Sequence, residues 1–323
     1  MSRSAAPEAP PAVPGAQGTD AGASLRTARQ RRQLHRSEHR WAMLFVAPPV
    51  LGFLLFTLYP VAFAAYASLT SWNGLGPMRF TGLDNYRRLL GDEYFHQSLF
   101  NTFFYMIGIP IGLALALLLA IALDRRIPGR TAFRTIYYVP VISSLAAIAI
   151  VWQFAYNGDF GLVNQVLAVV GIDGPNWLQD TGTVKPAIIL MMVWKGLGYS
   201  MLLYLAAIQS VPASLHEAAA LDGAGWWQRL FHITMPMVRP VTFFLVVTNI
   251  IGGAQLFTEI NIMTPNGGPE FSSASVVWYI WRQAFRYQQM GYATAMAMVL
   301  GVLILVITLI QFRLNRRNSF SID

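Results

Sequence analysis

Cysteine is absent from this 323-residue chain, and its absence excludes several kinds of chemistry. Without a thiol there is no disulfide framework, no thiolate metal site and no cysteine nucleophile, and the redox compartment stays undetermined. The chain has only two lysines, Lys185 and Lys195, and neither follows a glycine, so it lacks the Gly-Lys-Ser/Thr phosphate loop. If the chain works with ATP, another polypeptide must bind the nucleotide.

Charged residues are also scarce. They make up 12% of the chain, against about 25% in an average soluble domain, whereas 55% of the residues are hydrophobic. Six apolar stretches reach the roughly 20 residues that a helix needs to cross a bilayer. The sequence therefore predicts an all-α, polytopic membrane protein. The six expected spans are Trp41 to Leu69, Leu99 to Leu123, Thr135 to Tyr156, Val184 to Ile208, Pro236 to Met263 and Met290 to Phe312.

Basic residues are distributed unevenly among the segments that connect these spans. Arginine and lysine number seven in residues 1–40, four in 124–134, one in 209–235 and three in 313–323, against three in 71–98, none in 157–183 and two in 264–289. Because basic residues are retained on the cytoplasmic side, both termini and the segment 209–235 are expected in the cytoplasm.

The domain organisation follows from the same spans. We interpret residues 1–40 as a cytoplasmic tail, 41–312 as a six-span domain and 313–323 as a second cytoplasmic tail. The first 24 residues are rich in Ala, Pro and Gly, which predicts disorder. The arginines from Arg26 to Arg40 are expected to lie against anionic lipid rather than nucleic acid, because a span follows at once. The apolar run is too long for the core of a cleaved signal peptide.

The enzyme-like motif in this sequence is incomplete. His35, Glu38 and His39 have the spacing of an inverted zinc-protease motif, but they lie in a basic tail without a third ligand. No histidine falls in a predicted span, and Glu259 is the one carboxylate that does. We therefore expect no catalytic residue and no metal site in this chain. A channel and a membrane-bound enzyme remain as alternatives from other classes.

A polar loop follows the fourth apolar stretch. Ser214-x-x-Glu217 has the pattern of a capping box and predicts the start of a short helix, which Gly223 would end in a left-handed conformation. A second short helix is predicted from about Trp226 to Thr234. Small alanines beside Glu217 and Asp222 suit docking into a partner's cleft, and an ordinary surface helix is the alternative.

Polar side chains also lie inside the fourth and fifth spans. They could hydrogen-bond a sugar along a transport path, or simply bond between helices. Glu259 could reach the outer interface or line a solute path, and Lys195 could reach an interface or pair with an acid on a second subunit. The uncharged members of this set are Trp194, Tyr199, Ser200, Tyr204, Thr242, Thr248, Asn249, Gln255 and Thr258.

The polar loop, read on to Ile233-x-x-Pro236, resembles the EAA loop of ABC importer permeases, with Met235 where the family usually has leucine. The resemblance implies a coupling helix that sits in a groove of a cytoplasmic ABC ATPase dimer, which would bind ATP and Mg in place of this chain. The residues expected to couple to the ATPase are Glu217, Ala218, Ala219, Asp222, Gly223, Ala224 and Pro236.

The stretch from Trp194-x-Gly196-x-x-Tyr199 to Pro212 is similar to carbohydrate-uptake permeases of the maltose and glycerol-3-phosphate type, and Gly267-Gly268-Pro269 fits the same group. The resemblance implies a sugar permease of the bacterial cytoplasmic membrane, for a disaccharide or oligosaccharide, with glycerol-3-phosphate or a polyol as the alternative. It also implies a second homologous permease and an extracytoplasmic solute-binding protein. The expected substrate-path residues are Gly196, Tyr199, Asn249, Gly253, Gln255 and Leu256.

Overall fold

The computed structural model describes residues 43–125 and 128–319. The basic run from Arg26 to Arg40, with the motif at His35 to His39, lies outside the described residues. The chain divides into two compact units, one that ends at Phe63 and one that begins at Ala64. Each is described by itself.

The first unit carries most of a single helix that runs from Met43 to Ala67. Its 25 residues reach about 38 Å, which exceeds the roughly 30 Å of a hydrocarbon core. Inside it, Leu54–Leu58 form a π-helical turn (η1) ahead of α2 (Tyr59–Ala67). Pro60 has no N–H to donate to the preceding turn, and proline is a common cause of such local departures from α-helical bonding.

The larger unit begins with a small hairpin in which β1 (Thr70–Ser71) pairs antiparallel with β2 (Arg79–Phe80). Helix α3 (Asp84–Leu90) follows it. The Asn85 amide ties α3 to the hairpin, because Nδ2 donates to the carbonyl oxygens of Ser68 (2.8 Å) and Thr70 (2.9 Å).

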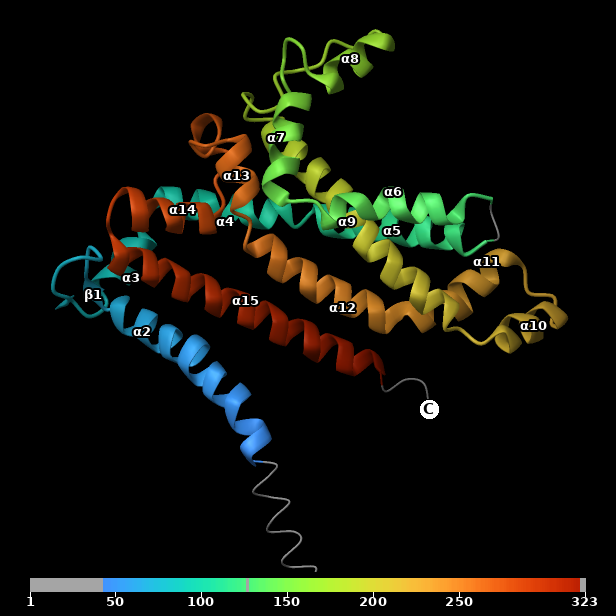
Figure 1. Ribbon diagram of the computed structural model, residues 1–323, viewed down its shortest axis with the longest axis horizontal. Helices are drawn as coiled ribbons and strands as arrows, with labels where there is room; N and C mark the ends of the chain where they lie inside the picture. Colours follow the sequence, from blue (N-terminus) through green and yellow to red (C-terminus); the bar gives the residue numbers. More distant parts are fainter. Residues whose placement is uncertain (1–42, 126–127, 320–323) are drawn as a thin grey trace, which may run out of the picture. The chain divides into compact units, whose positions relative to one another are not determined.

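Three long helical segments pack side by side in the middle of this unit (Figure 1). They are α4–α5 (Glu93–Tyr105 and Gly108–Asp124), α9 (Val184–Gln209) and α12 (Met235–Ala254). Glycines allow the close approach of α5 to α9, since a Cβ built at Gly108 would lie 2.9 Å from Ile189 Cγ2. The buried residues between them are Leu113, Ala116, Ala120, Leu123, Met201, Tyr204, Leu205, Ile208, Val238 and Leu245.

The third predicted span is not one straight helix, although the bent pair of helices that occupies it has the length and composition of one span. Helix α6 (Arg130–Ile142) and helix α7 (Leu145–Ala155) meet at an angle of 101°. Ser143 and Ser144 between them have ψ values of 148° and 127°, which are not helical. Each serine can hydrogen-bond nearby backbone in place of helix continuation, as Ser143 Oγ does by donating to Val139 O.

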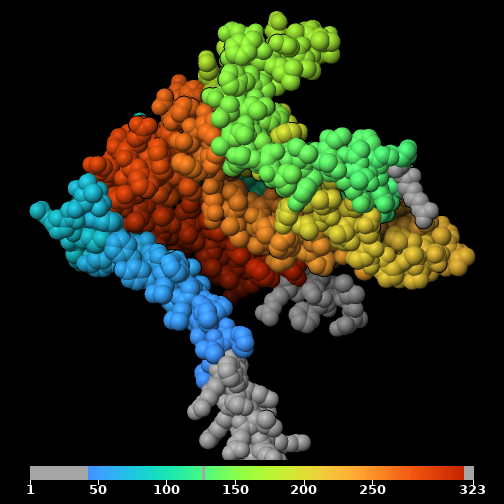
Figure 2. Space-filling view, in the orientation of Figure 1, coloured from blue at the N-terminus to red at the C-terminus, as the bar shows by residue number. Residues whose placement is uncertain are grey.

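Helix α7 leads to the short helix α8 (Leu162–Val169), and Figure 2 shows the α7–α8 segment projecting from the rest of the larger unit. Helix α6 itself lies against α9. At the crossing, a Cβ built on Gly198 would come 2.0 Å from the carbonyl oxygen of Tyr137. Only a glycine fits there, so the close crossing of α6 over α9 depends on that residue.

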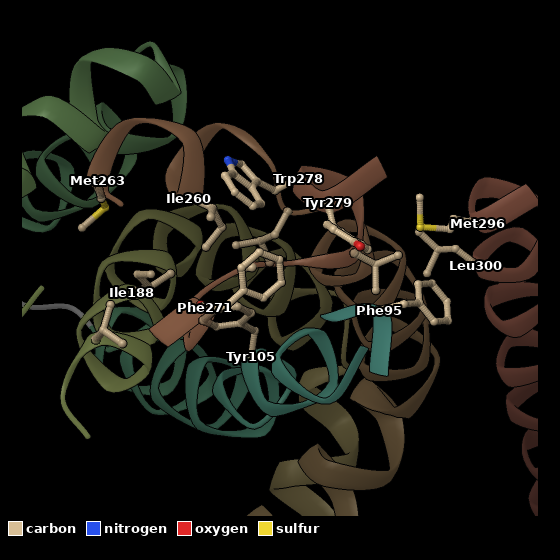
Figure 3. Close-up of a cluster of buried hydrophobic side chains, with 14 of the residues drawn as sticks. Phe95, Tyr105, Ile188, Ile260, Met263, Phe271, Trp278, Tyr279, Met296 and Leu300 are labelled. Carbon is tan, nitrogen blue, oxygen red and sulfur yellow. The ribbon is translucent and has the colours of Figure 1, made fainter. Parts of the chain in front are cut away.

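A second buried cluster lies where α4, α13 and α15 come together (Figure 3). It includes Phe95, Tyr105, Ile260, Trp278 and Met296. The elements that complete it are α13 (Thr258–Met263), η3 (Pro269–Phe271), α14 (Val276–Trp281), η4 (Arg282–Arg286) and α15 (Met290–Ser319).

Within this cluster, Asp92 at the N-cap of α4 ties that helix to α14 and α15. Its carboxylate accepts hydrogen bonds from the hydroxyls of Tyr279 (2.8 Å) and Tyr292 (2.5 Å), while the Arg88 guanidinium lies 4.1 Å over the Tyr292 ring. Burial raises the pKa of Tyr279, so its phenol stays a donor to the carboxylate at neutral pH.

Among the described residues, five helices have the length and composition to cross a membrane, and a sixth span results if the bent α6–α7 pair counts as one. The fifth predicted span also differs from the structure. The long helix in this region starts earlier than predicted, at Trp226, and ends earlier, at Ala254. Residues 255–257 separate it from the short helix α13. Glu259 therefore lies beyond the long helix rather than in it.

Candidate functional site

The polar loop folds as the helix α10 (Ala213–Leu221), followed by a tight turn. Gly223 has φ +78°, and two hydrogen bonds form around it: Ala224 N donates to Ala219 O (2.8 Å) and Gly223 N donates to Ala220 O (3.1 Å). This pair of bonds is a Schellman motif. The expectation that Gly223 ends the helix in a left-handed conformation is confirmed.

The capping box predicted at Ser214 and Glu217 is wrong. Helix α10 begins two residues earlier, with Pro212 as its N-cap in place of Ser214 and no side-chain capping bond. Ser214 is consequently already inside the first turn, where its hydroxyl cannot serve as the cap. The exposed carboxylate of Glu217 is left available for other contacts.

The second short helix is present. Helix α11 (Trp226–Arg229) continues through a π-helical turn, η2 (Leu230–Thr234), directly into α12. Gln228 Oε1 accepts from the Gly225 amide (2.7 Å) and fixes the start of α11. Any displacement of α10 can thus pass through α11 into the long helix α12, at whose start Pro236 lies.

The surface of this hairpin is apolar and uncovered in the isolated chain. Helix α10 has no buried residue, Leu221 is 90% exposed, and Trp227 is 65% exposed. Of the other residues expected to couple, Ala218 and Asp222 are exposed, whereas Ala219 and Ala224 are half-buried. An exposed apolar and small-residue surface rimmed by Glu217 and Asp222 fits a protein partner's groove.

A cavity of about 350 Å³ lies among α5, α9 and α12, toward the α13 end of these helices. Its polar lining groups include the Tyr199 and Ser200 hydroxyls and the Asn249 amide. Asn249 Nδ2 donates to Leu245 O (2.7 Å), which fixes the direction of the amide. Mixed apolar walls with a few placed polar groups are typical of small-molecule sites.

Glycines give this cavity its width. A Cβ at Gly196 or at Gly252 would meet no atom within 4 Å, so both positions border open space. Gly108 and Gly112, four residues apart on α5, also line it. Sequence analysis missed these two, although a small-xxx-small spacing in an apolar helix is a known sign of close helix contact.

The structure brings together five of the six predicted substrate-path residues. Gln255 is the exception, because it lies at the C-cap of α12, outside the cavity lining. Of the wider polar set, Tyr204 is buried in the packed cluster and Trp194 packs against Trp152 with ring centroids 5.5 Å apart. The five residues that line the cavity are Gly196, Tyr199, Asn249, Gly253 and Leu256.

Lys195 and Glu259 both line the same cavity. Burial is the largest influence on the Glu259 carboxyl group, and the Lys195 charge also acts on it. Of the alternatives that the sequence left open for Glu259, this position favours the solute path over the outer interface. One cation and one anion balance each other formally, so the cavity has no excess charge of either sign from these two groups.

Comparisons with known proteins agree with this architecture. Residues 108–320 match the family described as "Binding-protein-dependent transport system inner membrane component". The probable ABC transporter permease protein YesP of Bacillus subtilis (strain 168) is 38% identical over 283 residues, covering 86% of this chain and 91% of the relative. The lactose transport system permease protein LacF of Rhizobium radiobacter is 36% identical over 282 residues, covering 85% and 94%.

A solved structure shares the fold as well. A chain in the crystal structure of a bacterial alginate ABC transporter, in complex with an alginate pentasaccharide-bound periplasmic protein, superposes with a TM-score of 0.76 at 26% identity, covering 90% of this chain and 98% of that one. The resemblance drawn from the Glu217 loop is thereby confirmed at the level of the family. The chain belongs to the inner-membrane components of binding-protein-dependent transport systems, as a multi-pass permease subunit of an ABC importer.

Proposed function

We propose that this chain forms half of the pore of an ATP-driven importer for a neutral disaccharide or oligosaccharide. The central cavity would be part of the solute path, a second homologous permease would complete it, and an extracytoplasmic binding protein would deliver the sugar. Relatives support the solute class, since their printed names include lactose, arabinooligosaccharide and diacetylchitobiose systems.

The observation that carries the proposal is the convergence of Tyr199, Ser200 and Asn249 on a cavity widened by glycines. Sugar hydroxyls need hydrogen-bond partners once water is removed, and a tyrosine ring also offers a face to the C–H surface of a sugar. The offsetting charges of Lys195 and Glu259 favour an uncharged solute over glycerol-3-phosphate, which would leave the anion without a matched site.

Helix α10 would transmit the work of a separate ATPase. The exposed Leu221, the small alanines and the carboxylates of Glu217 and Asp222 have the chemistry expected of a helix that docks in a groove of a partner protein. Movement of α10 would reach the cavity through α11 and α12, because α12 carries Asn249 at the cavity wall. In this role Glu217 and Gly223 transmit force and do no chemistry.

The test is reconstitution of the assembled transporter with its ATPase and second permease. We expect ATP hydrolysis stimulated by sugar-loaded binding protein, no hydrolysis by this chain alone, and loss of uptake in Glu217→Lys with normal membrane insertion. Asp173→Lys, a charge reversal at an exposed site remote from α10, serves as the matched control and should transport normally. Hydrolysis by the chain alone, or normal uptake by Glu217→Lys, would contradict the proposal.

A further inference from the structure

A second cavity, of about 520 Å³, lies near the far end of α7 from the bend, outside the central one. Its walls are the end of α7, the segment around Asn176, and the chain that follows α13. Five amide side chains line it, and we refer to it as the amide pocket. They are Gln153, Asn157, Asn176, Gln179 and Asn266.

The amide pocket and the central cavity lie in series along the same two helices. On α7, Leu145 lines the central cavity and Gln153 lines the amide pocket, eight residues or about 12 Å further along. On α13, Glu259 faces the central cavity and Met263, one turn on, faces the amide pocket. Buried Ala149 on α7 and Ile260 on α13 fill the contact between the two cavities, so passage from one to the other requires these helices to separate.

The lining of the amide pocket suits an uncharged, hydroxyl-rich ligand. No residue that lines it carries a formal charge. An amide side chain carries both donors and an acceptor, as the hydroxyls of a sugar require. The Asn157 oxygen already accepts from the amides of Asp159 (2.9 Å) and Phe160 (3.2 Å), so this side chain offers a ligand its N–H donors. A charged solute would be desolvated here without a counter-charge, which is unfavourable. Its volume is within the range of small-molecule sites.

The wall that carries Asn266 is held in an unusual backbone conformation. Glu270 and Phe271 have φ values of 50° and 63°, in the left-handed region that non-glycine residues rarely adopt, and Gly267 and Gly268 have φ values of 83° and 78°. Such strain persists only where surrounding structure enforces it, and it gathers at functional sites.

The bonds that enforce this conformation come from α4. Asn101 Nδ2 donates to the carbonyl oxygens of Phe271 and Ala274 (both 3.1 Å), and the Tyr105 hydroxyl donates to Ser273 O (2.8 Å). These donors are buried, so the loop is fixed before any ligand arrives. A fixed wall lowers the entropic cost of binding.

The opposite wall is equally constrained. The Tyr156 hydroxyl donates to Ala187 O (2.8 Å) on α9, and Asn164 Nδ2 donates to Gly158 O (3.2 Å). A Cβ at Gly158 would lie 1.8 Å from Asn176 Oδ1, so the glycine makes room for that amide.

We propose that the amide pocket is an outer binding site for an uncharged sugar unit, which the solute occupies before it enters the central cavity. The proposal rests on the function proposed above, and it assigns a role to the Gly267-Gly268-Pro269 segment that the coupling helix and the central cavity leave unexplained.

The direct test is protection of a thiol. The chain contains no cysteine, so Asn266→Cys introduces a single reactive site in this subunit, and Gln165→Cys on α8, outside the pocket, is the matched control. In the assembled transporter without binding protein, the probe is the disaccharide that the wild type imports, chosen from lactose, maltose and cellobiose. We expect that sugar to slow thiol labelling at Asn266→Cys severalfold and to leave Gln165→Cys unaffected. Equal rates with and without sugar at Asn266→Cys would overturn the proposal.

A kinetic test complements the labelling. Gln153→Leu removes one amide from the pocket, and Gln165→Leu is the control. Loss of one sugar hydrogen bond corresponds to about a fivefold rise in the KM for uptake, with ATPase coupling unchanged. An unchanged KM in Gln153→Leu would contradict the outer-site proposal. If Asn249→Ala still abolished uptake, the proposed importer function would remain supported. If the wild type imports no sugar from a wider panel, the function itself is wrong.

Discussion

At the scale of single residues, glycines decide how closely neighbouring helices of this permease approach one another. Gly198 and Gly196 lie two positions apart on α9 and have opposite surroundings. A Cβ at the first would clash with the Tyr137 carbonyl, while the second faces open space. The sequence shows two equivalent glycines, and only the packing of α6 on α9 tells them apart.

This difference gives a prediction for a matched pair of substitutions. Gly198→Ala should destabilise the purified transporter by about 2 kcal/mol or more, because backbone atoms of α6 have to move. Gly196→Ala should retain or slightly raise stability, since alanine favours the helix and meets no atom. Thermal unfolding in detergent measures both. Equal melting temperatures for the two variants would show that α6 does not cross α9 at Gly198.

The charges in the central cavity give a second prediction at this scale. Glu259→Gln leaves Lys195 without its balancing carboxylate, so uptake of an anionic sugar should rise relative to a neutral one. Lys195→Met should shift the ratio in the opposite direction. A competition assay between a neutral disaccharide and its uronic-acid counterpart reports the ratio, and an unchanged ratio in both variants would exclude these groups from the solute path.

At the scale of elements, α10 and the α6–α7 bend show two different degrees of predictability. The stop at Gly223 follows from local chain chemistry, because glycine alone adopts left-handed φ at no steric cost. The capping box failed because α10 starts two residues earlier, with Pro212 as its N-cap, and Ser214 falls inside the first turn. The 101° bend of α6 and α7 had only weak local signals in Pro140 and the two serines.

The Schellman turn supports a prediction for α10. Gly223→Val places a β-branched residue at φ +78°, costs about 1–2 kcal/mol of local strain and should lower sugar-stimulated ATP hydrolysis severalfold. Gly223→Asn, which tolerates the left-handed region, should retain most of the activity. ATPase assays on reconstituted transporter compare them at equal membrane levels. Equal loss in both variants would mean that side-chain bulk, not backbone conformation, is what the partner senses.

At the scale of the molecule, large apolar side chains are exposed along the long helices of the larger unit, among them Leu118, Ile136 and Leu309. Such a surface is expected of a protein whose outer side chains contact lipid and partner subunits instead of water. Helix α10 lies near one end of this unit, and α7 and α13, which carry part of the amide-pocket lining, lie near another (Figure 1). The proposals above therefore assign solute entry and ATPase docking to different ends of the unit.

Sidedness can be measured because the chain has no native thiol. Leu221→Cys on α10 should react with a membrane-impermeant maleimide only after the cells are lysed. Ile172→Cys, in the segment after α8, should react in intact spheroplasts, since both side chains are exposed and the distribution of basic residues predicts opposite sides of the membrane for them. Reaction of Leu221→Cys in intact spheroplasts would invert the topology and remove the basis for ATPase docking.

By itself, the sequence determined the membrane class, the number of apolar stretches and the glycine stop of α10, because each depends on composition or on neighbours within a few residues. It indicated the family through the resemblance of the Glu217 loop. It also named Tyr199 and Asn249, but through resemblance rather than through geometry. Only the tertiary structure joined those residues with Gly108, Lys195 and Glu259 around one cavity, since helices far apart in the chain must pack before their side chains can share a space.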